Sequence, residues 1–381
     1  MKFNKFGTAV LLCGVFGAFA ANAFETTARN AILMDFDTGE YLFEKNITEA
    51  VPPASMSKLM TVYILMKKIK DGSIKLDDTF SVSENAWRKG GAATGGSTMF
   101  LSIGDNVSVE NIIKGIVIQS GNDACIVVAE NIAGTEENFA ELMNKTAAEL
   151  GLKNSSFANS TGLPHPDQKM SMEDLAILSR HIISEFPDLY HYFKEKEFKY
   201  NNINQGNRNP LLYSMPGADG LKTGHTEEAG FCLAASAVKD DRRLIEVMSG
   251  MSSNKERSDE SERLMSWGFR EFTNVKMFDE GQVVASAKVW YGKDKTVDMA
   301  VADKVIKTVH GSQLDNVKTT AEYDEPIKAP IKAGDQIGTL KIEIAEQNPL
   351  EVPLVAVKDV EKIGLIGRFW ANFKYFLFGA K

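Results

Sequence analysis

Three short motifs carry the residue types needed for nucleophilic catalysis. They are Ser55-Met56-Ser57-Lys58, Ser120-Gly121-Asn122 and Lys222-Thr223-Gly224, in that order along the chain. A serine hydroxyl is a weak nucleophile that needs a neighbouring base, and a lysine amine can take that role without a histidine. The set therefore predicts a serine that attacks a carbonyl carbon and forms an acyl-enzyme.

We expect Ser55 near the N-terminus of a helix. It follows Pro52-Pro53 and precedes an apolar run with helical spacing over residues 59–66, which is typical of a helix start. Residues three apart share a helix face, so Lys58 can reach the Ser55 hydroxyl, and the helix N-terminus favours negative charge on that oxygen. The alternative is a capping serine beside a solvated lysine, which leaves the other two motifs unexplained.

The second and third motifs fall at the edges of predicted elements. Helical patterns over residues 109–117 and 124–133 place Ser120 at a junction between two helices, where side chains are commonly presented into clefts. A helix-capping role is the alternative for Ser120, and it does not exclude catalysis. Lys222 begins a strand-like pattern that continues through residues 231–238 and 244–248 as an antiparallel meander.

The order of elements predicts an α+β fold. A hairpin over residues 32–43 comes first, helical patterns fill the middle, including residues 139–150 and 172–184, and the meander is followed by a helix over 259–269. Strands at both ends with helices between them favour one antiparallel sheet with helices on both faces and a helical subdomain. We assign this catalytic domain to residues 24–273.

The C-terminal third has a different pattern. Short strands at 283–289, 296–301, 316–319 and 339–344 predict a small β-sandwich-like domain over residues 274–356. Residues 357–381 end in an amphipathic helix, whose apolar stripe comprises Ile363, Ile366, Phe369, Trp370, Phe373 and Leu377. The same segment is basic from Lys362 onward and has no acidic residue there, which favours the surface of an anionic membrane over the alternative of a helix docked on the core.

The N-terminus has the features of an export signal. Lys2 and Lys5 precede an apolar stretch over residues 6–20, and Ala21-Asn22-Ala23 fits a small-x-small cleavage pattern. We expect residues 1–23 to be a signal peptide. Its apolar stretch is too short for a convincing membrane span.

Composition limits the remaining possibilities. The 381 residues carry a formal net charge of −8 and no long basic run, which argues against nucleic acid as a partner. The five histidines show no metal-ligand spacing, and neither a metal nor another cofactor is expected. Cys125 and Cys232 lie in apolar runs that favour buried thiols, although export would permit a disulfide between them.

The motifs and their flanking residues resemble one protein family over nearly the whole chain from Glu25. The stretches PPASMSKLMT, IQSGNDAC, NSTGLPHP, DGLKTGHTEEAG and IKAPIKAGDQIGTL occur in register. Together with the terminal amphipathic helix, they are similar to the low-molecular-mass penicillin-binding proteins that act as exported D-alanyl-D-alanine carboxypeptidases. The Ser-Asp-Asn pattern shared by penicillin-binding proteins and class A β-lactamases has Asp where this chain has Gly121.

The resemblance implies a role for each motif residue. Ser55 would attack the carbonyl between two D-alanines, with Lys58 as its base. Ser120 and Lys222 would pass a proton to the leaving amine, and Asn122 would hold the substrate's side-chain amide. The backbone N–H groups of Ser55 and His225 would form the oxyanion hole.

Further implied residues and partners concern the substrate. Thr223 and Gly224, with Arg257 and Arg208, would lie at the terminal carboxylate. An exposed salt bridge of Arg257 with Glu256 or Asp259 is the alternative for that arginine. The implied substrate is a peptidoglycan stem peptide ending in D-Ala-D-Ala, and β-lactam antibiotics would acylate Ser55 and block the enzyme.

The same resemblance places the protein at the periplasmic face of the inner membrane, anchored peripherally by the C-terminal helix. Three other functions stay open at this level. A D,D-endopeptidase has the same motifs but usually lacks the small β domain and the anchor. A β-lactamase would need a Glu-x-x-Leu-Asn motif, which is absent from residues 160–169. A cell-wall scaffolding protein with a degenerate site disagrees with the three intact motifs.

Overall fold

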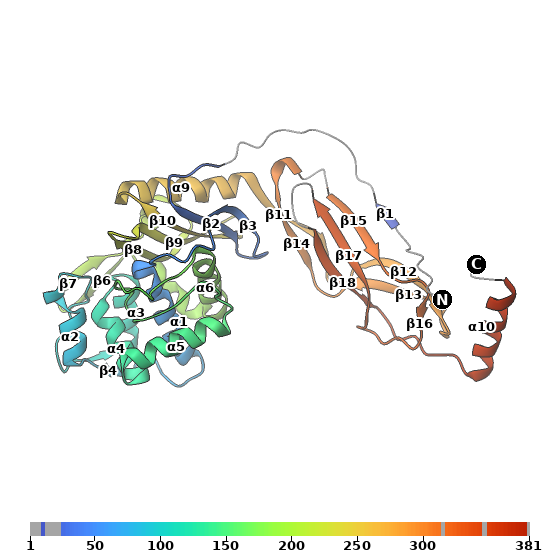
Figure 1. Cartoon of the computed structure of the whole chain (residues 1–381), viewed down its shortest axis with the longest axis horizontal. Helices are drawn as coiled ribbons and strands as arrows, with labels where there is room; N and C mark the ends of the chain where they lie inside the picture. Colours follow the sequence, from blue (N-terminus) through green and yellow to red (C-terminus); the bar gives the residue numbers. More distant parts are fainter. Residues whose placement is uncertain (1–8, 12–23, 314–316, 345–348, 379–381) are drawn as a thin grey trace. The chain divides into compact units, whose positions relative to one another are not determined.

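The computed structural model describes residues 9–11, 24–313, 317–344 and 349–378, in two compact units (Figure 1). The larger unit is Ala23–Arg270, and the smaller one joins Glu271–Lys381 with Met1–Asn22. The predicted signal peptide lies outside the described residues except for β1 (Ala9–Leu11), a strand that pairs with β15 (Val317–Glu322). The cleavage signal stays a prediction.

The larger unit contains a five-stranded antiparallel sheet in the order β3-β2-β10-β9-β8. Its strands are β2 (Asn30–Asp35), β3 (Tyr41–Lys45), β8 (Ala218–Thr226), β9 (Gly230–Lys239) and β10 (Arg242–Met251). The predicted hairpin and meander are therefore confirmed. Strand β8 is an edge strand, and the third motif lies on it.

Helices fill the sequence between the two parts of the sheet. They are η1 (Ala54–Ser57), α1 (Lys58–Lys70), α2 (Glu84–Gly90), η2 (Ala92–Thr94), α3 (Val109–Val117), α4 (Asn122–Ala133), α5 (Glu136–Glu149), α6 (Met172–Glu185), α7 (Pro187–Tyr190), η3 (His191–Lys194) and α8 (Leu211–Ser214). The short strand pairs are β4 (Thr79–Ser81) with β5 (Asn106–Ser108) and β6 (Glu197–Tyr200) with β7 (Ile203–Gly206). The sequence patterns identified α1 and α3 to α6 but missed α2, α7 and α8.

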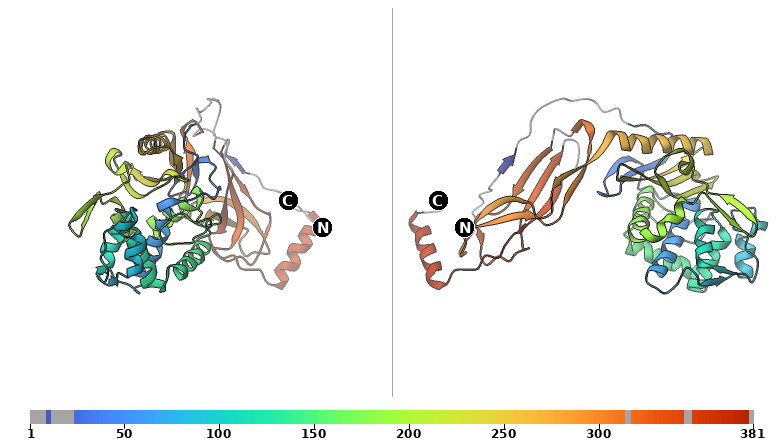
Figure 2. Two further views of the ribbon diagram at one scale, coloured as in Figure 1. Left: turned by 60° about the vertical axis from the view of Figure 1, so that its left-hand side comes forward. Right: turned by 180° about the vertical axis from the view of Figure 1, so that it is seen from behind.

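The sheet has a hydrophobic core on each face, as the alternation of strand side chains requires. On β2, Ile32 and Met34 belong to the larger core with α1 and α6, while Ala31 and Leu33 belong to a second core. That second core is covered by α9 (Asn254–Glu271), which contributes Leu264 and Met265. Figures 1 and 2 show α9 on one face of the sheet and α1, α3, α4, α5 and α6 on the opposite side. The predicted α+β architecture is confirmed.

The cysteines of this unit are buried free thiols. Cys125 lies on α4 and Cys232 on β9, and both side chains are fully buried. Burial raises the pKa of each thiol, to about 12 for Cys125 and about 11 for Cys232. The buried-thiol interpretation is confirmed, and the disulfide alternative is wrong.

The smaller unit is mainly β-structure, as predicted. A seven-stranded sheet has the order β1-β15-β17-β18-β13-β12-β16, and β11 pairs with β14 separately. The bounds are β11 (Phe272–Phe278), β12 (Val283–Trp290), β13 (Thr296–Val301), β14 (Val305–His310), β16 (Ile327–Lys328), β17 (Gln336–Ile344) and β18 (Leu350–Ala356). Strands β11, β14, β16 and β18 were not predicted, although β18 has apolar side chains at alternate positions, Leu350, Val352 and Leu354.

The chain ends in helix α10 (Leu365–Phe378). Leu365, Ile366 and Phe369 are 77%, 78% and 68% exposed, so these apolar side chains are not docked on the core. A search of the described residues finds no helix with the length and apolar content that crossing a membrane requires.

Candidate active site

The first motif folds as one tight turn that leads into a helix. Ser55 lies in the 3-10 turn η1, and Lys58 is the first residue of α1. The Lys58 Nζ atom is 2.8 Å from Ser55 Oγ and also donates a hydrogen bond to the carbonyl oxygen of Thr161. Lys58 is completely buried. The nucleophile and its predicted base are therefore in direct contact.

A glycine lets the third motif approach this turn. A Cβ atom on Gly224 would lie 3.1 Å from the Ala54 Cβ and 3.1 Å from the Pro53 carbonyl oxygen, tighter than ordinary contacts. Lys222 lies two residues earlier on β8 and therefore on the same face of the sheet. The close approach at Gly224 brings this buried lysine into the surroundings of Lys58.

Burial of the two lysines favours their neutral forms. Removal from water lowers the pKa of Lys58 from 10.5 to about 8. The pKa of Lys222 is well below its ordinary value, first because of burial and then because of repulsion from Lys58 and Arg208. A neutral Lys58 amine has a lone pair that can accept the Ser55 proton, which its charged form lacks.

The second motif is held in an unusual backbone conformation. Ser120 has a φ of +62°, and its buried hydroxyl has no hydrogen-bond partner among the described residues. The Gly121 N–H donates to the Gly115 carbonyl at 2.9 Å, and the Asn122 N–H donates to the Ser97 carbonyl at 2.8 Å. These bonds fix a loop in which the Ser120 hydroxyl remains available for a proton.

The structure explains why glycine occupies position 121. A Cβ atom there would lie 2.9 Å from Asp123 Oδ1 and 3.1 Å from the Met99 backbone nitrogen. Asp123 is completely buried, and its carboxylate accepts bonds from the Thr98 hydroxyl and the Met99 and Leu101 N–H groups. Asp123 thus ties the 98–101 segment to the start of α4, and a side chain on residue 121 would disturb this contact.

Most predicted site residues line one cavity of about 580 Å³. Its walls are formed by Ser55, Ser97, Ser120, Arg208, Pro210, Tyr213, Thr223, Gly224, His225, Phe231, Asn254 and Arg257. Lys58, Asn122 and Lys222 are buried and are not among the residues that line this cavity, although Lys58 contacts Ser55, which does. Residues from η1, the α3–α4 junction, β8 and α9 therefore meet in one place.

The cavity is also lined by two arginines, Arg208 and Arg257, which come from parts of the sequence far from Ser55. Arg257 lies in the first turn of α9, because this helix begins at Asn254 and not near residue 259 as predicted. It is 7% exposed, and Asn254 Oδ1 accepts a bond from its Nη2 at 2.8 Å. Its Nε has no hydrogen-bond partner among the described residues. Burial lowers the pKa of Arg257 to about 10.

The exposed salt bridge suggested for Arg257 is wrong. The carboxylate of Glu256 accepts bonds from the Ser252 N–H and the Thr27 hydroxyl, while Asp259 pairs with Lys255. A buried arginine without a carboxylate partner is costly unless something else pairs with it. This favours an anionic ligand at Arg257.

Arg208 and His225 complete the rim of the cavity. Arg208 Nη1 donates to Ser97 Oγ at 2.6 Å, and the Arg208 carbonyl accepts a 3.4 Å bond from Arg257 Nη2. The exposed His225 ring lies 4.0 Å, centre to centre, from that of Phe231. Both arginines therefore belong to the same cavity wall.

Several contributing residues were not predicted. Ser97 orients Arg208, Asn254 holds Arg257, and Thr161 accepts a bond from Lys58. Only Thr161 had a sequence signal, because it stands in the turn-rich Asn159–Pro164 segment, where Asn159 Oδ1 accepts from the N–H groups of Thr161 and Gly162. Within the described ranges, no cluster of three or more His, Cys, Asp or Glu side chains could hold a metal ion.

Comparisons with known proteins agree over most of the chain. The family model described as D-alanyl-D-alanine carboxypeptidase matches residues 17–253, and the model of the penicillin-binding protein 5 C-terminal domain matches residues 272–362. The D-alanyl-D-alanine carboxypeptidase DacC of Escherichia coli K12 is 40% identical over 371 residues, which cover 96% of this chain and 93% of DacC.

This chain also resembles solved structures of penicillin-binding proteins. Penicillin-binding protein 5 from Haemophilus influenzae superposes with a TM-score of 0.83 at 35% identity, covering 90% of this chain and all of that one. Penicillin-binding protein D2 from Listeria monocytogenes, solved in its ampicillin-bound form, has a TM-score of 0.56 at 26% identity. It covers 66% of this chain and 100% of its own.

The lowered pKa of Lys58 predicts how Ser55 should respond to pH. Lys58 is protonated below about pH 8 and neutral above it. Covalent labelling of Ser55 by a small reactive ester should therefore accelerate as pH rises through this value, measured by intact-protein mass spectrometry. Lys58→Gln should slow labelling at least about 100-fold, whereas Lys75→Gln, at an exposed position, should match the parent protein. A labelling rate that stays constant through this pH region would contradict the assignment of Lys58 as base.

Proposed function

The chain belongs to the D-alanyl-D-alanine carboxypeptidase family, and from this premise we propose that it removes the terminal D-alanine from peptidoglycan stem peptides through an acyl-enzyme on Ser55. The observation that carries the proposal is the 2.8 Å contact between Ser55 Oγ and the buried Lys58 amine. The cavity beside this pair offers a cationic wall for a free carboxylate. Such a wall suits a peptidase that acts at a chain end.

Acylation begins when the neutral Lys58 amine takes the Ser55 proton and Ser55 Oγ bonds to the carbonyl carbon between the two D-alanines. The backbone N–H groups of Ser55 and His225 hold the resulting oxyanion, a role in which each donor commonly lowers the barrier by about 3 kcal/mol. The C–N bond then breaks as the leaving amine gains a proton through Ser120 and Lys222. Water later attacks the Ser55 ester and releases the shortened peptide.

Groups farther along the cavity recognise the substrate. Thr223, Arg257 and Arg208 bind the terminal carboxylate, and an arginine can present two parallel N–H donors to it. Gly224 keeps β8 close to Ser55, and Asn122 binds the amide of the peptide. The buried Arg257, with no carboxylate partner among the described residues, supports this assignment.

Penicillins should be trapped on the same serine. Their ring carboxylate has the charge that the arginine pair binds, and opening of the ring leaves no separate leaving group to diffuse away. The ampicillin-bound form of the Listeria protein, which shares this fold, supports binding of β-lactams here.

We also propose where the enzyme works. Residues 1–23 would be removed on export, leaving a catalytic domain over 24–273 and a small β domain over 274–356. Residues 357–381 would attach the protein peripherally to the outer face of the cytoplasmic membrane. Support for attachment comes from the exposed apolar side chains of α10 together with the excess of basic residues in this segment.

The carboxypeptidase activity is tested directly by D-alanine release. The purified protein should release one D-alanine from a soluble peptide ending in Lys-D-Ala-D-Ala, and Ser55→Ala should reduce the release to background, because the acyl-enzyme cannot form. Labelling of Ser55 by penicillin without any D-alanine release would instead favour D,D-endopeptidase action on cross-linked wall.

Carboxylate binding by Arg257 predicts a substrate-dependent defect. Arg257→Gln should lower kcat/KM about 30-fold for peptides with a free terminal carboxylate, because a charged hydrogen bond is lost. The loss should be much smaller for the matching peptide with an amidated end. Arg263→Gln, on the same helix but more exposed, is the control. Equal losses for both peptides would remove Arg257 from the carboxylate site.

Membrane attachment predicts a loss of vesicle binding. Replacing Ile366 and Phe369, which are one helical turn apart, with serine should reduce cosedimentation with vesicles that contain anionic lipid by at least about tenfold. Val283→Ser changes an exposed apolar residue on β12, outside residues 357–381, and should bind like the parent protein. Unaltered binding of the double variant would show that this helix face does not attach the protein.

A further inference from the structure

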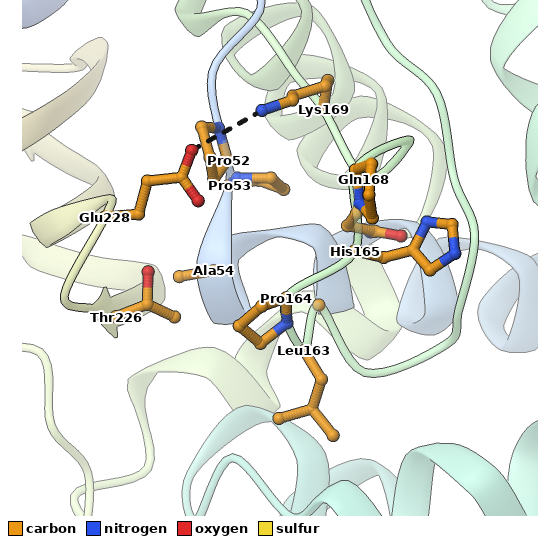
Figure 3. A pocket seen from close by; sticks show the side chains of 12 residues that line it. Pro52, Pro53, Ala54, Leu163, Pro164, His165, Gln168, Lys169, Thr226 and Glu228 are labelled. Atoms are coloured by element: carbon orange, nitrogen blue, oxygen red, sulfur yellow. Dashed lines mark ion pairs between the residues drawn. The ribbon is translucent and has the colours of Figure 1, made fainter.

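A buried carboxyl group lies beneath helix α9, outside the cavities that adjoin the nucleophile. Glu246 is on β10 and is completely buried. One adjoining cavity, of about 580 Å³, is lined by Ser55, and a second, of about 390 Å³, has Ala54 and Thr226 in its wall (Figure 3). Glu246 lines neither of them. Any effect of Glu246 on the reaction therefore has to pass through another residue.

The strand pattern turns the Glu246 side chain toward α9. Leu244 and Met248, two residues before and after it, belong to the core that α9 covers, and side chains two apart on a strand share a face. The residues paired with Glu246 on the neighbouring strands are Leu33 of β2 and Ala235 of β9, which belong to the same core. An acid therefore occupies a position that apolar residues surround within the sheet.

The carboxyl group has no fixed partner in this core. Neither of its oxygens has a hydrogen-bond partner among the described residues. The buried Ser261 hydroxyl of α9 faces this region but donates to Met248 Sδ at 3.7 Å. Burial raises the pKa of Glu246 well above its ordinary value, and Ser261 opposes this rise only in part. Glu246 is therefore neutral where an exposed glutamate is charged.

The charged groups on this side of the sheet do not compensate Glu246. They are Asp35 on β2, Lys45 on β3, His225 on β8, Lys239 on β9, Arg242 on β10, and Arg257 and Glu260 on α9. Asp35 and Arg242 pair with each other at 2.8 Å, and Glu260 pairs with Arg263. Among the described residues, none of these charges contributes to the pKa shift of Glu246.

Helix α9 lies closely on this part of the sheet and carries Arg257. Arg257 precedes Ser261 by four residues, so the two side chains share a helix face. Arg257 Nη1 donates to the Cys232 carbonyl of β9 at 3.5 Å. Farther along α9, a Cβ atom on Gly268 would collide with the Leu33 side chain, which shows how close the helix and the sheet are. The position of Arg257 therefore depends on how α9 packs above Glu246.

We propose that Glu246 is a positioning residue for the carboxylate site: its neutral carboxyl group keeps the first half of α9 against the sheet, and its ionisation displaces these turns and with them Arg257. A charge formed beneath Ser261 has to be solvated, and water reaches a fully buried group only if the helix moves outward. Carboxylate binding then weakens at alkaline pH, while Ser55 and Lys58 stay in place on η1 and α1. This inference rests on the proposed role of Arg257.

The first test is the pH dependence of stability. Above its ordinary pKa of 4.5, Glu246 loses its proton in the unfolded chain but keeps it in the folded protein. The free energy of unfolding therefore falls as the pH rises toward the folded-state pKa, which for buried glutamates can reach about 8 to 9. Glu246→Gln removes this titration. Its melting temperature should gain at least about 3 °C on that of the parent protein between about pH 6 and pH 9. Glu246→Leu, which is apolar like its neighbours, should show the same gain.

The second test is the pH dependence of substrate binding. The parent protein and Glu246→Gln are compared on one peptide ending in Lys-D-Ala-D-Ala, because Lys58 and Arg257 titrate in both proteins. Relative to the variant, the KM of the parent should rise about fivefold between about pH 7 and pH 9, as expected when a charged hydrogen bond is weakened, with kcat unchanged. Glu262→Gln, at an exposed position of the same helix, should behave like the parent.

These measurements separate the inference from the proposed function. A melting-temperature difference that stays constant over this pH range would overturn the inference, because Glu246 would then not titrate beneath α9. Equal KM curves for the parent and Glu246→Gln would overturn it as well. Absence of D-alanine release in all of the proteins would overturn the carboxypeptidase function instead, and the melting temperatures would still decide whether ionisation of Glu246 destabilises the packing of α9.

Discussion

The proposed chemistry of this site depends on holding two lysines out of water near one serine. Lys58 and Lys222 are both buried, and burial lowers the pKa of each. A solvated lysine would stay charged near neutral pH and could not accept the Ser55 proton. The surrounding elements serve this requirement. Gly224 allows β8 to close on the 3-10 turn, and Thr161 provides a carbonyl for the Lys58 amine.

The same electrostatics link substrate binding to the state of the lysines. Arg208 and Arg257 repel a proton on Lys222, so an empty carboxylate site favours its neutral form. A bound carboxylate offsets these two positive charges. In the proposed mechanism, Lys222 would then hold a proton more easily, at the stage when a proton has to reach the leaving amine. Under this proposal, binding of a free chain end would prepare the proton path as well as the geometry.

The sequence predicted the parts of this site that depend on local spacing. Ser55 and Lys58 are three residues apart at a helix start, and the α3–α4 junction at Ser120 followed from two helical patterns. Long-range contacts were harder to predict. The Ser97 hydroxyl orients Arg208 across 111 residues, and no local pattern marks such a pair. Arg257 was placed before its helix because residues 254–258 are polar and give no apolar period, although Asn254 is its first residue.

An open strand edge usually invites association with other chains, and many proteins cover it or shorten it. Strand β8 is nine residues long, and its edge must stay accessible if substrates are to lie along it. Protection of this edge against association with other chains then has to come from the selectivity of the site for its substrate. Gly224 lies against Pro53 and Ala54, which leaves no room for a side chain there, and under the proposed function the two arginines would accept only a chain that ends beside them with a free carboxylate. The features that choose a substrate would therefore also keep this edge from pairing with the internal segments of unfolded proteins.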